Sequence, residues 1–298
     1  HVETEVTLPC AGEYVISVFC SNSDGDGPVA RLTQFIGKDI PVMPMNVTAE
    51  KTGGLVTISW NAVTETVNGG YMDPSEVRYR IVRMPDSVTV ADNISETSVS
   101  DEVDDPENGY VKYSYTVTAL YGENESYPGI SNSIGFGSMT PPYFNAIENE
   151  DDFGDFLVID ANEDGRTWIL NSTNAQCSYH ETNMMDDYLV LPPMNLEKGK
   201  VYIFSMEAWA RWNERVEVVY GAAPTPEAMT GIVCAPVEIN DENPITLEGT
   251  IIPEETGVYH IAVHGISDPD QFMLFVDNIS LSSGLATDAP GPVENVSL

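Results

Sequence analysis

The sequence predicts an all-β protein made of tandem β-sandwiches, and three observations lead to this fold class. Short runs in which apolar and polar residues alternate recur along the chain, rich in β-branched and aromatic residues, as in Val56–Trp60, Val77–Arg83 and Tyr113–Val117. Clusters of turn-forming residues such as Asn68-Gly69-Gly70 separate these runs. No window of helix length repeats its apolar positions with a period of about 3.6 residues. Since 42% of the 298 residues are hydrophobic, the chain has enough apolar side chains to form real cores.

The chain repeats parts of itself. Pro44–Thr48 returns as Val293–Ser297, and Glu13–Val18 is echoed by Lys112–Val117. We therefore expect the chain to begin late in one copy of a β module, to run through a complete copy and to end just inside another. Arrays of small β modules usually present or space binding surfaces, which points to adhesion or display.

Residues 41–137 resemble a fibronectin type III domain over their whole length. The points of match are Pro44-x-x-Val47, Trp60, Tyr79 and Tyr113-x-Tyr115-x-Val117. The resemblance implies that Trp60 is a core residue and that the domain is a spacer. Residues 1–40 resemble the C-terminal part of a preceding copy, because Leu8–Tyr14 looks like its tyrosine corner.

Residues 138–285 have longer predicted strands, such as Lys200–Trp209 and Val258–His264, which suit a jelly-roll sandwich. Three motifs make this region resemble the cleaved-adhesin, or choice-of-anchor J, family of bacterial surface proteins: Asp160-x-Asn162-x-Asp164-Gly165-x-x-Trp168, Asp187–Pro193 and Phe275–Leu281. Residues 286–298 are expected to be a linker and the start of a further fibronectin type III-like domain.

The charge of the chain is strongly negative. Lys and Arg number 12 against 47 Asp and Glu, a formal net charge of -35. Such a balance argues against nucleic acid and anionic membranes as partners, and it suits a secreted or surface protein, or one rich in sites for hard cations. Simple solubility explains much of it equally well. We expect no membrane insertion. A disulfide between Cys177 and Cys234 is possible, and the sequence does not decide whether it forms.

A calcium site is expected at the first of these motifs. Asp160, Asn162 and Asp164 alternate before Gly165, so a curled loop can aim their oxygens at one point. The twelfth position is Asn171, which excludes an EF-hand. The family resemblance implies that Asp277 returns near this loop as a further ligand. Glu148 and Asp152 are weaker candidates. The alternative is an Asx-rich turn without metal.

The best candidates for a ligand platform are Trp209, Arg211 and Trp212. Aromatic faces stack on sugar rings, and Arg211 and Glu207 carry groups that bond hydroxyls. Strand alternation points Trp209 away from Phe204, Met206 and Ala208. The alternative is that one or both tryptophans close the end of the sandwich.

No credible catalytic site is found. His260 and His264 would be about 13 Å apart on a strand, too far to share a metal. The acid pair Asp186-Asp187 is of a kind expected by chance in so acidic a chain. We expect a non-enzymatic extracellular fragment that binds glycan or matrix protein, with structural Ca²⁺ and with neighbouring β domains of the same longer chain. The rivals are a structural stalk and an accessory part of a larger protease or glycoside hydrolase.

Overall fold

The computed structural model describes residues 4–284 and is all-β, as predicted. It divides into two compact units, one containing the chain up to Asp104 together with Lys112–Ile134, the other containing Asp105–Val111 together with the chain from Gly135 onward. The predicted domain boundaries at residues 40/41 and 137/138 stay predictions. The expected start of a further module at 286–298 lies outside the described residues. No helix in residues 4–284 has the length and apolarity needed to cross a bilayer.

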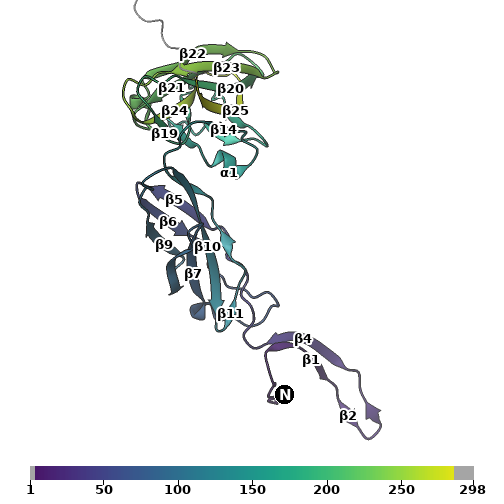
Figure 1. Ribbon diagram of the computed structural model, residues 1–298. Coiled ribbons are helices and arrows are strands. Elements are labelled where there is room, and N and C mark those ends of the chain that lie inside the picture. Colours follow the sequence, from purple (N-terminus) through teal and green to yellow (C-terminus); the bar gives the residue numbers. More distant parts are fainter. Residues whose placement is uncertain (1–3, 285–298) are drawn as a thin grey trace, which may run out of the picture. The chain divides into compact units, whose positions relative to one another are not determined.

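The first unit contains a β-sandwich and a hairpin (Figure 1). One sheet has the order β5-β6-β9, and the other has the order β11-β10-β7-β8, with β12 and β13 also pairing to β10. The bounds are β5 (Thr48–Thr52), β6 (Leu55–Ser59), η1 (Pro74–Glu76), β7 (Arg78–Met84), β8 (Val88–Ile94), β9 (Ser98–Glu102), β10 (Tyr110–Tyr121), β11 (Asn124–Glu125), β12 (Gly129–Ile130) and β13 (Ile134–Gly137).

The core of this sandwich lies between its two sheets, where every second residue of the main strands is buried. Ile58, Ile81 and Tyr115 are fully buried, and Trp60 is only 5% exposed, so the predicted core role of Trp60 is confirmed. The Trp60 and Tyr79 rings meet edge to face, with centroids 5.3 Å apart.

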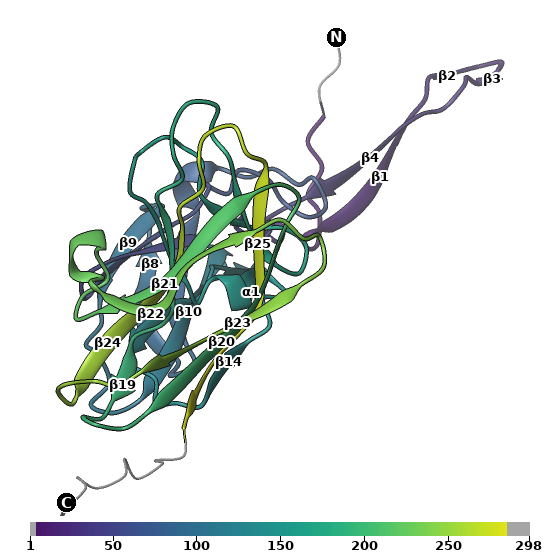
Figure 2. The same cartoon turned by 90° about the horizontal axis from the view of Figure 1, so that it is seen from above.

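The hairpin pairs β1 (Gly12–Val18) with β4 (Ala30–Ile36), and β2 (Ser21–Asn22) with β3 (Gly25–Asp26) forms its tip (Figure 2). The Tyr14 hydroxyl donates to the carbonyl of Cys10 at 2.7 Å, the kind of local bond that a tyrosine corner makes. Ile16, Val18 and Leu32 are exposed, since no second sheet of residues 4–284 covers this ribbon. Cys20 shares strand parity with Tyr14, Ile16 and Val18, which predicts a buried side chain. Cys20 is exposed for the same reason as Ile16 and Val18, so that prediction is wrong.

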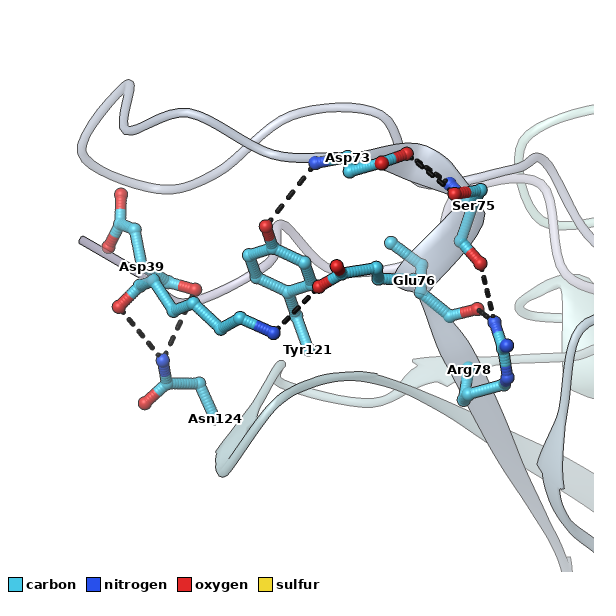
Figure 3. Close-up of polar contacts among 9 residues, drawn as sticks. Asp39, Asp73, Ser75, Glu76, Arg78, Tyr121 and Asn124 are labelled. Atoms are coloured by element: carbon cyan, nitrogen blue, oxygen red, sulfur yellow. Dashed lines mark hydrogen bonds and ion pairs between the residues drawn. The ribbon is translucent and has the colours of Figure 1, made fainter. Parts of the chain in front are cut away.

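A buried carboxylate joins the hairpin to the sandwich within the first unit. Asp39, 1% exposed, accepts from the backbone and side-chain amides of Asn68 at 2.9 and 2.8 Å. Figure 3 shows the neighbouring contacts: the Asn124 amide donates to the carbonyls of Lys38 and Asp39, and Lys38 pairs with Glu76 at 2.7 Å. These bonds fix the start of the sandwich relative to the base of the hairpin.

The second unit is a jelly-roll sandwich of two sheets. One sheet has the order β16-β17-β25-β20-β23 with β14 beside β25, and the other has the order β15-β18-β24-β21-β22 with β19 beside β24. The bounds are β14 (Tyr143–Asn145), α1 (Glu150–Phe153), β15 (Leu157–Asp160), β16 (Trp168–Leu170), β17 (Ala175–Ser178), β18 (Asp187–Val190), β19 (Met194–Leu196), β20 (Tyr202–Ala210), β21 (Glu214–Gly221), η2 (Pro226–Ala228), β22 (Gly231–Ile239), β23 (Ile245–Ile251), β24 (Gly257–Gly265) and β25 (Met273–Ser283).

The core of the second unit lies between these sheets. On β20 the alternate residues Phe204, Met206 and Ala208 are fully buried, and on β21 so are Val216 and Val218. The predicted facing of β20 is therefore confirmed, and Trp209 lies on the opposite face, where it is partly exposed. The loops that follow β20 and β22, and the loop that precedes β25, carry the candidate site.

Candidate functional site

Three loops of the second unit together line an open depression of about 470 Å³. The turn between β20 and β21 supplies Arg211, Trp212 and Asn213, the turn after β22 supplies Asn240, and the loop before β25 supplies Gln271. The Trp212 side chain is 57% exposed. The depression therefore presents one aromatic face among planar polar groups that both donate and accept hydrogen bonds.

The Trp212 ring packs against Phe272. The two rings lie 5.6 Å apart between centroids at 40°. The backbone N–H of Phe272 donates to Glu214 Oε1 at 2.6 Å, and Glu214 is fully buried. This hydrogen bond to a buried side chain holds the loop in place, so the exposed tryptophan packs against an anchored residue.

The structure separates the three residues predicted to bind a ligand. Arg211 and Trp212 line the same depression, but Trp209 does not. Trp209 lies on the sheet face and stacks on Phe275, its partner on β25, with the rings 5.4 Å apart and 7° from parallel. The reason is that β20 ends at Ala210, so Trp209 obeys strand alternation whereas Trp212 belongs to the turn beyond it. Glu207 also stays on the sheet, where it accepts from Asn278 at 2.9 Å.

Sequence reasoning missed Asn213, Asn240, Gln271 and Phe272. Asn213 is one residue from Trp212 and was within reach of the motif. Asn240 follows β22 and Gln271 precedes β25. Both are far from Trp212 in the sequence, and no local signal connects them to it.

The predicted calcium loop forms a tight Asx-rich turn. The carboxylate of Asp160 accepts from the backbone N–H of Asp164 at 3.2 Å and of Gly165 at 2.8 Å. Asn162 Oδ1 also accepts from Asp164 N–H at 3.1 Å, and Asp164 Oδ1 accepts from Arg166 N–H at 2.8 Å. The oxygens thus stabilise the turn by themselves, as the metal-free alternative requires.

Asp277 is not brought to this loop. It lies on β25, opposite Glu207 of β20, whereas Asp160 ends β15 in the other sheet. Burial raises the pKa of Asp277, the amide of Asn278 opposes this, and the charges of Glu207 and Glu148 add to it. The expected set of four ligands therefore does not fit a single ion. Throughout residues 4–284, no three His, Cys, Asp or Glu side chains are grouped as a metal site would need.

A buried acid adjoins the Asp160 turn instead. Asp187 pairs with Asp160 in the β15–β18 register, is 1% exposed, and its Oδ1 has no hydrogen-bond partner. Burial raises the pKa of Asp187 to about 7, the nearby hydroxyl of Thr167 opposes the shift, and the charges of Asp160 and Asp164 add to it. This carboxyl is therefore half-protonated near neutral pH.

Asp186 and Asp187 do not form a catalytic acid pair. Asp186 bonds His264 Nε2 at 2.8 Å, and Glu217 bonds the other ring nitrogen at 2.9 Å. His264 also stacks on Tyr188 with ring centroids 3.8 Å apart. This cluster ties β24 to β21 and to the start of β18.

The four cysteines are free thiols, so the open Cys177–Cys234 bridge is not formed. Burial raises the pKa of Cys177, and the charge of Asp187 adds to the shift. Burial also raises the pKa of Cys234 to about 11. Both thiols are therefore held in the unreactive protonated form.

Similar folds occur among solved structures. The K1 cleaved adhesin domain of Lys-gingipain from Porphyromonas gingivalis W83 is 15% identical over 48% of this chain and 99% of that domain, with a TM-score of 0.39. The CBM22-1 xylan-binding domain from Paenibacillus barcinonensis is 10% identical over 47% of this chain and 92% of that one, with a TM-score of 0.33. A fibronectin type III variant is 15% identical over 32% of this chain and 94% of its own, with a TM-score of 0.24. No protein-family model and no curated protein matches the sequence. A proposal about function therefore rests on this chain's own residues.

Proposed function

We propose that the second unit is a non-catalytic saccharide-binding module of an extracellular protein, and that its binding surface is the depression around Trp212. The observation that supports this most is the exposure of Trp212, 57%, on a base fixed by Phe272 and the buried Glu214. An exposed indole face beside hydrogen-bonding side chains offers a surface on which a ligand can stack.

The groups around Trp212 suit sugars. A pyranose presents C–H groups on its faces and hydroxyls at its rim, so an aromatic face and surrounding planar amides match both. Asn213, Asn240 and Gln271 each offer a carbonyl and an NH₂ group, and Arg211 adds a fork of N–H donors. The structural-stalk rival expects both tryptophans to be buried and no depression, which the exposure of Trp212 disfavours. A matrix-protein partner remains an outcome of the test below.

Trp212→Ala should weaken binding to the responding glycan at least tenfold, about 1.4 kcal/mol, because the stacking face is lost. Affinity is measured by calorimetry on the full chain after a screen of glycans and matrix proteins. Trp209→Ala is the matched control, since it removes the same side chain from the sheet face outside the depression. Equal effects of the two substitutions, or binding to matrix proteins alone, would contradict the proposal.

We further propose that the Asp160–Gly165 turn holds a structural Ca²⁺ through Asp160, Asn162 and Asp164, without Asp277. The hard oxygen donors of three alternate residues and the unpartnered Oδ1 of Asp187 beside them support this. When bound, the ion would neutralise part of the local negative charge and tighten the turn.

Asp164→Ala should then lower the melting temperature clearly in calcium and little in EDTA, as scanning calorimetry in the two buffers would measure. The reason is that ion binding to the folded state adds stability that the variant cannot gain. An equal loss in both buffers would show a role limited to the Asx turn and reject the ion.

A further inference from the structure

An aromatic row extends from Trp212 across the loops of the second unit. Phe272 contacts both other rings, with centroids 5.6 Å from that of Trp212 and 6.2 Å from that of Tyr179. The N–H of Tyr179 donates to the carbonyl of Phe272 at 3.0 Å, which fixes the spacing of the two. All three side chains are at least partly exposed. A chain of sugar rings, rather than one ring, can lie along such a row.

A second depression, of about 340 Å³, lies at the Tyr179 end of the row. Its lining includes Arg166, Ser178, His180, Glu181 and Met273. Gln271 belongs to the first depression and Met273 to the second, so Phe272 stands between the two. The row therefore joins two hollows that carry polar groups.

Each hollow carries one guanidinium group. Residues 138–284 contain only five Lys or Arg residues: Arg166, Lys198, Lys200, Arg211 and Arg215. Lys198 and Lys200 pair with Glu255 and Glu197. Within the described part of the chain, neither Arg166 nor Arg211 takes part in an ion pair, and both are exposed. Two unpaired cations thus flank one aromatic row in a chain of net charge -35.

The two guanidinium groups favour a ligand that carries negative charge. The many distant carboxylates repel an anion only weakly at physiological salt, where the screening length is about 8 Å. A guanidinium within the site acts at contact distance and binds carboxylate or sulfate through two parallel hydrogen bonds. Glu181 lies in the second hollow with Arg166 and limits the number of ligand anions there. Arg166 can pair with one anionic group, but Glu181 would repel additional ones.

We propose that the aromatic row and its two guanidinium groups form an extended site for an acidic oligosaccharide. The sugar rings lie over Trp212, Phe272 and Tyr179, and the anionic groups pair with Arg211 and Arg166. This inference rests on the saccharide-binding function proposed above and adds the charge and length of the ligand.

The test compares oligosaccharides of equal length on the full chain by calorimetry: oligogalacturonate, sulfated chondroitin oligosaccharide and neutral galacto-oligosaccharide. We expect at least one acidic series to bind tenfold or more tighter than the neutral one, and which one responds distinguishes carboxylate from sulfate. R166Q and R211Q should each weaken acidic binding about tenfold, and each should weaken acidic binding more than neutral binding. K198Q, which removes a cation already paired with Glu255, should change neither.

Length dependence gives a second, independent readout. Y179A should weaken binding of a long acidic oligosaccharide and leave a disaccharide unaffected, because only the long ligand reaches that ring. Equal affinity for neutral and acidic glycans, with no effect of R166Q and R211Q, would overturn this inference and leave the Trp212 site intact. Failure of every glycan to bind the folded chain would overturn the proposed function and this inference together.

Discussion

Asp187→Asn should raise the free energy of unfolding of the second unit by about 4 kcal/mol at pH 8 and hardly change it at pH 4. The carboxyl is buried, one of its oxygens lacks a partner, and its pKa in the folded protein is about 7 against 3.8 for the free side chain. Each pH unit between these two pKa values lowers the free energy of unfolding by about 1.4 kcal/mol. The reason is that the folded protein must release a proton that it binds more tightly than the unfolded chain does.

The sign of this effect follows from the direction of the shift. Between about pH 4 and pH 7 the folded state holds more protons than the unfolded state, so wild-type stability falls as pH rises through this window. Asparagine has the same shape and no charge, so the variant lacks this slope. Denaturant unfolding in EDTA at several pH values measures both proteins, with the exposed Asp268→Asn as control. Parallel pH profiles for wild type and Asp187→Asn would contradict the buried, uncompensated carboxyl.

Asp39→Ala should destabilise the first unit by about 3 to 5 kcal/mol. The carboxylate is 1% exposed and accepts from Ile40 N–H at 2.7 Å and from two amides of Asn68. Alanine would remove the acceptor of all three bonds, and a hydrogen bond to a charged group contributes about 1.5 to 3 kcal/mol.

The pH dependence of this loss distinguishes it from a packing effect. Burial alone would raise the pKa of Asp39, but the bonds from Asn68, Thr66 and Ile40 outweigh it and lower the pKa. Its stabilisation is therefore complete above about pH 4 and is lost as pH falls further, so wild type and Asp39→Ala should converge in acid. Chemical unfolding followed across this range is the measurement. Asp73→Ala is the control, since the side chain of this N-cap of η1 accepts only local bonds, from Ser75 (Figure 3). A loss no larger than that of Asp73→Ala would argue against the role of Asp39.

The fold could be predicted from the sequence because its signals are local. In a strand, successive side chains point to opposite faces, so the alternation of Phe204, Met206 and Ala208 was enough to place Trp209 on the outer face. Trp60 as a core residue and the bond from Tyr14 to Cys10 likewise depend on motifs a few residues long.

The site depended on contacts between distant parts of the chain. Trp212 and Arg211 were recognisable as neighbours in sequence, but Asn240 and Gln271 join them only because β20 and β22 end, and β25 begins, near the same depression. Packing between distant strands also places Asp277 and Asp160 in different sheets. It buries Asp187, whereas the adjacent Asp186 bonds His264.

The sequence by itself thus determined the fold class, the sheet face on which the side chains of β20 lie, and the segment that contains Arg211 and Trp212. Only the tertiary structure decided which loops meet, which carboxylate is buried and which cations are left unpaired. The physical reason is that strand alternation and turn formation are set by neighbouring residues, whereas burial, ion pairing and the grouping of loops depend on how two sheets pack against each other.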